Sequence, residues 1–141
     1  MKSKKVNNFY VVRLEKGEEI LSSLTKFCED NKVYSGSISG IGGIDDVTLK
    51  YYDLEKKEYL PKRFSEGVNY EIIALNGNIS RLEGKPFVHM HITLGDPEYK
   101  VFGGHLGSAK ISITAEICIN VLDKPIDRKL DKKFRLNFLD L

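Results

Sequence analysis

Three histidines are the residues of this sequence best suited to chemistry, and they are its only histidines. His89 and His91 stand two positions apart in the segment 88–94, where apolar residues alternate with polar ones. Alternation of this kind predicts a strand with both imidazoles on the same face. The Cα atoms of such neighbours lie roughly 7 Å apart. Two imidazole side chains can close that span around one ion.

His105 is the third candidate ligand, and it comes directly after Gly103 and Gly104. Two adjacent glycines let a loop approach the preceding strand closely, as a third ligand requires. Three neutral imidazoles suit zinc, while iron, nickel and copper are chemically acceptable, and a fourth position stays open for water or substrate. The alternative is three separate surface or hydrogen-bonded histidines. We predict that His89, His91 and His105 bind one divalent transition metal, with zinc preferred.

Three charged residues are secondary candidates for the site. Glu116 is expected on the polar face of a strand, and Glu71 stands beside an apolar segment. Either carboxylate could orient a ligand imidazole or act as a general base, against the alternative of a solvated or structural carboxylate. Arg13 lies in an apolar strand and is a candidate for anion binding, against the alternative of an ion pair at a sheet edge.

Several glycine-rich segments do not fit the catalytic motifs that they partly match. Segment 40–45 has Asp45 where a dinucleotide fingerprint needs its third glycine, and no clear helix follows it. In segment 36–40 the serines flank the position that a nucleophile elbow requires. Lys85 is followed by Pro86 where a phosphate loop needs Ser or Thr. The sequence therefore favours neither nucleotide binding nor serine catalysis.

The elements that must position these residues are mostly strands. After a first strand at 9–14, apolar residues between Ile20 and Cys28 repeat at helical spacing, and this pattern fails near residue 30. Glu18 and Glu19 suit the positive end of this helix. The remaining strand patterns cover residues 33–41, 47–52, 70–75, 88–94, 101–102 and 110–122.

Turns and the best strand pattern add detail to this expectation. Asn76-Gly77 and the segment 83–86 are typical of turns. In the strand 110–122, strict alternation predicts a core face that holds Ile111, Ile113, Ala115, Ile117, Ile119 and Val121. One face of this strand should therefore be buried and the other polar.

Composition limits the choice of partners. Lys and Arg number 22 against 20 Asp and Glu, and the formal net charge of +2 is too small to indicate strong attraction to nucleic acid or anionic membranes. No stretch reaches transmembrane length, and the N-terminus lacks the apolar run of a signal peptide. Cys28 and Cys118 are far apart and form no C-x-x-C pair, which fits a reducing compartment. We expect a cytoplasmic protein without membrane contact.

Length and hydrophobic content favour one domain. The 141 residues, of which 41% are hydrophobic, can form one core without disulfides. We expect a single domain over residues 1–141, in which residues 124–141 form a charged C-terminal extension that ends in apolar residues. This extension could pair at a sheet edge or cover a neighbouring subunit.

Several weak motifs follow one another along nearly the whole chain, and their order is more specific than any one of them. They comprise residues 10–14 with Gly17-Glu18, the glycine cluster 36–43, the segments 70–78 and 89–96, the element 103–106 and the strand around Glu116. In this order they resemble the plants-and-prokaryotes-conserved (PPC or PCC) domain family, in its stand-alone prokaryotic form. The resemblance implies an α/β (α+β) fold with a mixed, strongly twisted sheet, a flanking helix and assembly as a homotrimer.

The resemblance also bears on function. The implied fold is similar to that of alpha-acetolactate decarboxylase, where a histidine-bound zinc polarises the substrate, and this favours the three-histidine site. Plant members of the family join the domain to AT-hook segments with an Arg-Gly-Arg-Pro core, and no such core occurs in this sequence. A DNA-binding function would therefore transfer by analogy alone.

Three functional hypotheses follow. The first is a homotrimeric metal-binding protein whose open site acts on an unidentified small molecule, with the metal as a Lewis acid or as an activator of water. The second is a DNA-binding or regulatory module without an AT-hook, and the third is a structural metal with a partner at a subunit boundary. Asp127 and Asp131 interrupt the basic residues available to the second hypothesis, which are Lys2, Lys4, Lys5, Arg128, Lys129, Lys132, Lys133 and Arg135.

Overall fold

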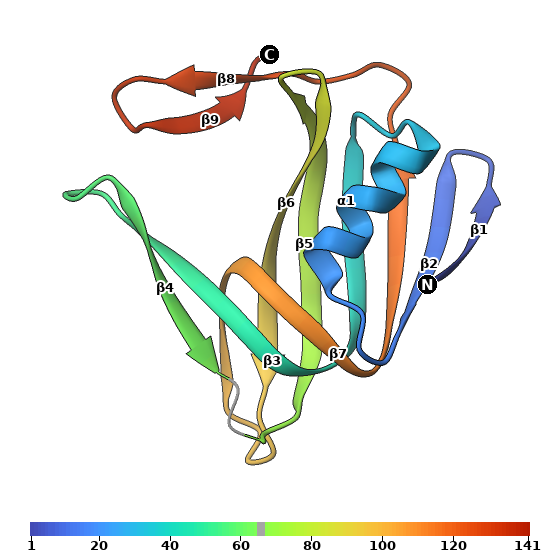
Figure 1. The fold of residues 1–141 in the computed structure, drawn as a ribbon, viewed down its shortest axis with the longest axis vertical. Coiled ribbons are helices and arrows are strands. Elements are labelled where there is room, and N and C mark those ends of the chain that lie inside the picture. The colour runs from blue at the N-terminus through green and yellow to red at the C-terminus, as the bar shows by residue number, and fades with distance from the viewer. Residues whose placement is uncertain (65–66) are drawn as a thin grey trace.

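A single helix lies against a strongly twisted sheet in the computed structural model, which describes residues 1–64 and 67–141 (Figure 1). The helix is α1 (Ile20–Asn31). The strands are β1 (Lys2–Val6), β2 (Phe9–Glu15), β3 (Gly36–Asp53), β4 (Glu58–Phe64), β5 (Tyr70–Leu82), β6 (Lys85–Gly95), β7 (Val101–Val121), β8 (Arg128–Asp131) and β9 (Leu136–Leu139).

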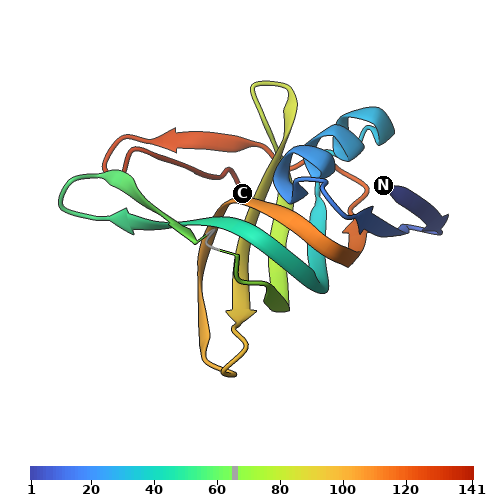
Figure 2. The same ribbon diagram turned by 60° about the horizontal axis from the view of Figure 1, so that its bottom comes forward.

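The large sheet closes on itself through its two longest strands. Its order is β1-β2-β7-β6-β5-β3-β4, and an additional pairing joins β7 to β3. The strands β3, β5, β6 and β7 thus form a closed circuit of pairings. Figures 1 and 2 show β3 and β7 running obliquely across the other strands, as the twist of a closed sheet requires.

The large sheet is antiparallel, whereas a mixed sheet was expected. Every pairing between the strands of the large sheet is antiparallel. Among the residues that the structure describes, the one parallel contact is an isolated bridge between Arg81 and Asp127. The strongly twisted sheet with one flanking helix is the architecture expected from the sequence.

The helix packs as its apolar spacing predicts. Ile20, Leu24, Phe27 and Cys28 are buried against the sheet. Glu19 caps the N-terminus by accepting hydrogen bonds from the backbone amides of the first turn, and its Oε1 also accepts one from the Ala109 amide at 3.0 Å. This cap ties the start of α1 to the middle of β7.

The alternation expected for strand 110–122 is wrong at one point. Ile113, expected in the core, is 71% exposed, whereas Ser112 is only 7% exposed. The cause is a register shift, because Ala115 pairs with Gly42 and Ile111 pairs with Ile44 on β3. Three residues of β7 therefore stand opposite one residue of β3, and the bulge reverses the faces locally.

The turn expected at Asn76-Gly77 is also wrong, since both residues lie inside β5. Gly77 pairs with Met90 of β6, and a Cβ atom at position 77 would meet the carbonyl oxygen of His89. The glycine therefore serves a close approach of two strands rather than a turn.

The C-terminal segment forms its own hairpin. Strands β8 and β9 pair with each other as a two-stranded sheet, next to the end of β5 (Figure 1). Arg81 anchors this segment by donating two hydrogen bonds to the Asp127 carboxylate, at 2.6 and 2.8 Å. The assignment of residues 1–141 to one domain with an extension at 124–141 stays a prediction. No helix in the described parts of the chain is long and apolar enough to cross a membrane.

Candidate metal centre

Strand β6 places the first two histidines. Val88, Met90 and Ile92 are buried in the core, and His89 and His91 alternate with them on the opposite face of the strand. The imidazole of His89 is half-buried, whereas that of His91 is exposed. The sequence alternation is sufficient to place this pair, because side-chain direction along a strand has a period of two residues.

His105 comes from β7, which lies beside β6. It was expected in a loop, but it lies within the long strand β7 and pairs directly with His91. Gly103 allows the strands to approach, because a Cβ atom at this position would meet the carbonyl oxygen of Ile92. The expectation that glycines bring His105 close to β6 is therefore met by strand pairing instead of a loop.

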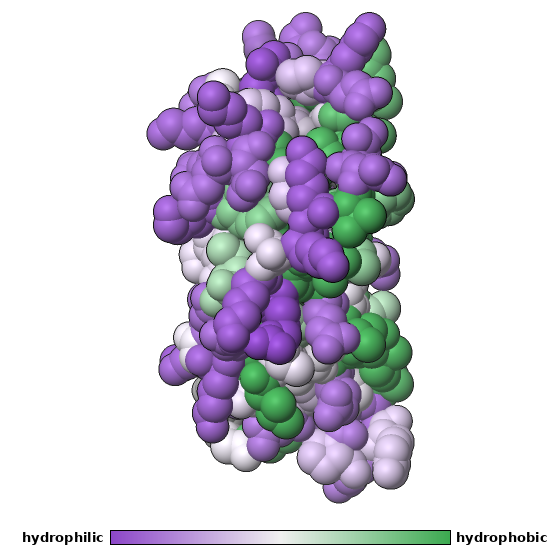
Figure 3. Space-filling model, turned by 90° about the vertical axis from the view of Figure 1, so that its right-hand side faces the viewer, coloured by the Kyte–Doolittle hydropathy of each residue, from purple (hydrophilic) through white to green (hydrophobic). Residues whose placement is uncertain are grey.

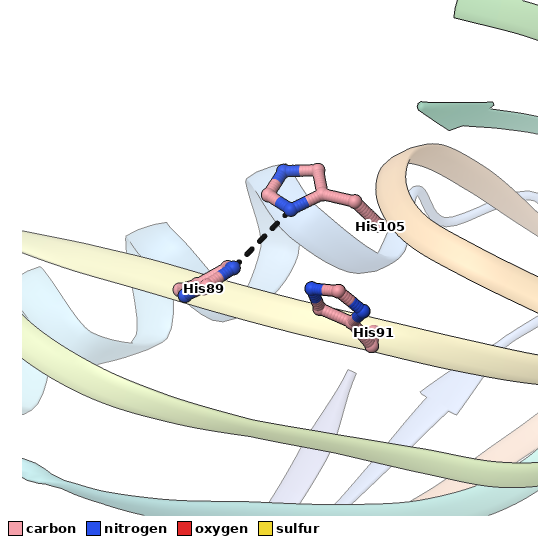
Figure 4. A group of neighbouring side chains, drawn as sticks. All are labelled: His89, His91 and His105. Atoms are coloured by element: carbon pink, nitrogen blue, oxygen red, sulfur yellow. Dashed lines mark hydrogen bonds between the residues drawn. The ribbon is translucent and has the colours of Figure 1, made fainter. Parts of the chain in front are cut away.

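The three imidazoles converge (Figure 4). Nε2 of His89 lies 3.2 Å from Nδ1 of His105, and one ligand nitrogen of each histidine lies within 4.8 Å of the other two. Two nitrogens that bind one zinc ion tetrahedrally at about 2.0–2.1 Å are roughly 3.4 Å apart. The His89–His105 separation already fits this value, and a rotation of the exposed His91 ring can adjust the third ligand.

Burial favours the neutral form of the imidazoles of His89 and His105. Desolvation, followed by the charge of Arg128 and the proximity of His91, lowers the pKa of His89. Desolvation, followed by His89, His91 and Lys50, lowers the pKa of His105 to about 4. Neutral imidazoles are the form that binds a metal, so both side chains are competent ligands at neutral pH.

A pocket of about 470 Å³ adjoins His89 and His105. Lys50 pairs in register with His105, and the ring of Tyr59 packs against the His105 ring with centroids 4.7 Å apart. Arg128 of the C-terminal hairpin lines the same pocket. The cluster is thus open on one side to a space that can hold a small molecule.

The secondary candidates lie elsewhere. Glu116 is exposed and pairs across the sheet with Arg13 and Ile41, and Glu71 is exposed on β5 opposite Gly95. Neither carboxylate lines the pocket beside the histidines. Their assignment as partners of a histidine or as a general base, and that of Arg13 as an anion site, stay predictions.

Arg13 has a partner of its own. Its Nη2 atom donates a hydrogen bond to Oε1 of Glu15 at 3.1 Å, on an exposed part of β2. The alternative expected from the sequence was an ion pair at a sheet edge, whereas β2 is an inner strand between β1 and β7. The Glu15 carboxylate also lies 3.5 Å from the Lys2 ammonium.

Two residues beside the histidines carry no recognisable signal in the sequence. Lys50 and Tyr59 come from β3 and β4, far from the histidines in the chain. Arg128 was grouped with basic residues for DNA contact, but the structure places it at the pocket. No local pattern identifies these three, because the crossing of β3 over β7 brings Lys50 and Tyr59 to the site, and the docking of the C-terminal hairpin on β5 brings Arg128.

The fold and this histidine site define the class of protein. The chain belongs to the Plants and Prokaryotes Conserved (PCC) domain family, whose family model matches residues 1–123. The resemblance drawn from ordered weak motifs is thereby confirmed.

Solved structures agree with this family. The chain is similar to a "putative DNA binding protein" of Bacteroides thetaiotaomicron, with 35% identity, a TM-score of 0.94, and coverage of 99% of this chain and 96% of that one. It is also similar to a metal-containing protein of Archaeoglobus fulgidus, with 31% identity, a TM-score of 0.86, and coverage of 97% and 96%.

Two further likenesses are partial. Acetolactate decarboxylase of Bacillus subtilis subspecies spizizenii is similar at 15% identity and a TM-score of 0.55, over 88% of this chain and 57% of that one, which concerns the fold alone. The bifunctional protein GlmU of Synechococcus is 30% identical over 112 residues. That match covers 78% of this chain but only 16% of GlmU, so the chain spans a small part of this curated relative.

Proposed function

We propose that this chain is a metal-binding PCC-domain protein in which His89, His91 and His105 hold one zinc ion or another divalent transition metal. The observation that carries the proposal is the convergence of three imidazoles, two of them 3.2 Å apart, beside a pocket. The similar metal-containing protein of Archaeoglobus fulgidus supports it. Three protein ligands leave a fourth position for water or a small molecule.

The surroundings of the cluster suit binding and catalysis on a small molecule. A metal held there supplies Lewis acidity or activates a water molecule. The chain's own residues prepare the site, because burial keeps His89 and His105 neutral and the Tyr59 ring fixes the orientation of the His105 ring.

Elemental analysis tests the metal site. Purified metal-replete protein should carry about one zinc-type ion per chain, and the double variant His89→Ala, His91→Ala should carry almost none. Thr93→Ala, on the same strand, is the matched control and should keep its metal, with circular dichroism to verify that all variants fold. Equal metal content in the double variant and the wild type would overturn the proposal.

Assembly as a homotrimer belongs to the same proposal. On the sheet, we define the outer face by the exposed apolar side chains of Val11, Ile41, Ile73 and Ile113. Figure 3 shows groups of apolar side chains at the surface between hydrophilic ones. An exposed apolar face of this kind favours association of a small protein with copies of itself.

A cytoplasmic location belongs to the same proposal. The free thiols of Cys28 and Cys118 fit a reducing cytoplasm.

DNA binding is the alternative, which the similar protein of Bacteroides thetaiotaomicron favours by its description. The basic residues do not gather for this function, since β1 and the β8–β9 hairpin lie on opposite sides of the molecule in Figures 1 and 2. We expect duplex binding to be weak, nonspecific and steeply reduced by salt. Titrations at several salt concentrations, with matched and scrambled duplexes and with His105→Ala, test this expectation. Tight, sequence-selective binding at physiological salt would make the DNA function primary.

A further inference from the structure

The pocket beside the histidines has an unbalanced charge. Among the residues that the structure describes, its lining includes three cationic side chains, Lys50, Arg128 and Arg135, and no aspartate or glutamate. The whole chain is almost neutral, with 22 basic and 20 acidic residues, so this local excess is not a consequence of composition. A concave site with charge of one sign attracts small ions of the opposite sign.

Arg128 has unused hydrogen-bonding capacity. Within residues 1–64 and 67–141, its guanidinium donates only to neutral acceptors: Ser80 Oγ at 2.6 Å, the Asn137 carbonyl at 2.7 Å and Asn78 Oδ1 at 2.8 Å. Since arginine carries five N–H donors, about two remain. The guanidinium also lies over the Phe87 ring, 4.8 Å from its centroid. Packing and three hydrogen bonds thus hold the charge in place without neutralising it.

The neighbouring carboxylate is committed elsewhere. Asp127 directly precedes Arg128, but both of its oxygens accept hydrogen bonds from Arg81. Burial lowers the pKa of Arg128, and the charged form is costly to desolvate without a counter-charge. In the described part of the chain, no carboxylate forms an ion pair with Arg128.

Lys50 supplies a second charge on the histidine side of the pocket. It stands opposite His105 on the paired strand, and its ammonium lies 5.9 Å from the centroid of the Tyr59 ring. Among residues 1–64 and 67–141, no carboxylate lies within ion-pair distance of this ammonium. Lys50 and Arg128 are therefore two cations that face one pocket and lack an anion.

The rest of the lining is apolar and aromatic. It includes Phe87, Leu106, Leu136 and Phe138, together with the ring of Tyr59. Pockets of a few hundred Å³ with an apolar lining and a few convergent polar groups bind small organic molecules. The lining thus provides a place for a hydrophobic body next to a place for a negative charge.

We propose that this pocket binds a small organic carboxylate, with its carboxylate near Arg128 and Lys50 and its apolar body against Phe87 and Phe138. The two remaining N–H groups of Arg128, one on Nη1 and one on Nη2, suit the two oxygens of a carboxylate. The inference rests on the proposed function in one respect, since it places the ligand beside the histidine cluster and so names the substrate class of that site. The cations themselves do not depend on a metal.

Calorimetric titration with benzoate and with its uncharged analogue benzamide tests the inference. The protein is the intact chain, both metal-depleted and zinc-loaded, as wild type, Arg128→Gln, Lys50→Gln and the control Arg63→Gln. Arg63 lies on the exposed strand β4 and pairs with Asp46 outside the pocket. Each pocket variant should bind benzoate about tenfold more weakly, as expected for the loss of one charge-assisted hydrogen bond, while Arg63→Gln binds as the wild type does.

The outcomes separate this inference from the metal proposal. Benzoate binding to metal-depleted wild type, with weakening in the Lys50 and Arg128 variants and little binding of benzamide, supports the carboxylate site even where no metal is retained. Absence of benzoate binding, equal binding of benzamide, or unchanged affinity in both variants overturns it even where zinc binds to the histidines. Because Arg128 also holds the hairpin through Ser80 and Asn78, thermal melts verify the fold of its variant, and Lys50→Gln provides the independent measurement.

Discussion

The histidine pocket and the outer face lie on the same sheet but differ in how charge is arranged. In the pocket, Lys50 and Arg128 have no carboxylate partner in the described residues, and the imidazoles of His89 and His105 are half-buried. On the outer face, the exposed apolar side chain of Ile113 adjoins Arg13 and Glu15, which form an ion pair with each other. Charges without a counter-charge in a concave site favour the binding of a small ligand, whereas an exposed apolar surface favours contact with another protein.

The largest expected effect comes from the backbone of the histidine pocket, where β6 and β7 approach closely. Gly103→Ala should lower the free energy of unfolding by about 2–3 kcal/mol, as overpacking between two strands does, and should abolish metal retention by displacing His105 from β6. Urea denaturation of metal-free protein and zinc analysis measure the two effects. Gly104→Ala is the matched control, since its Cβ would make only an ordinary contact of 3.4 Å with the Lys50 carbonyl oxygen. Equal behaviour of the two variants would contradict the close approach at Gly103.

A charge on the outer face should break assembly and leave the pocket intact. Ile41 is 57% exposed beside Val11 and Ile73. Ile41→Glu should reduce the mass in light scattering from that of the proposed trimer to that of a monomer, because a buried unpaired carboxylate strongly disfavours an apolar interface, while zinc content stays unchanged. Leu54→Glu, at the exposed turn after β3, should remain trimeric. A trimer that persists in Ile41→Glu would remove the outer face from the interface.

The smallest expected effect is the contribution of His105 to the pH dependence of stability. His105 has a folded pKa of about 4 against about 6.5 for an unfolded histidine. Between these values the unfolded chain binds more protons, so metal-free protein should lose stability as the pH falls from about 6.5 to about 4. The melting temperature of His105→Asn should decline less over this window, by a few degrees. Val11→Ala, on the outer face, should show the wild-type decline, and an identical slope in His105→Asn would refute the assignment.

The sequence pattern predicted correctly which residues share a face wherever the geometry of a single helix or strand decides it. The spacing of Ile20, Leu24 and Phe27 correctly predicted the buried side of α1, because helical geometry alone sets which residues share a face. The same holds for His89 and His91 on β6. Pattern failed at Ile113, where a bulge set by pairing with β3 reverses the face of the strand.

In the candidate site, too, some features follow from the sequence and others from the tertiary structure. The type and number of the histidines, and the common face of His89 and His91, were determined by the sequence, since residue identity and a period of two need no partner strand. The place of His105 was decided by the pairing of β7 with β6, and the places of Lys50, Tyr59 and Arg128 by the closure of the sheet and the docking of the C-terminal hairpin. These contacts join segments far apart in the chain, and packing between strands, rather than any local propensity, selects the register that brings them together.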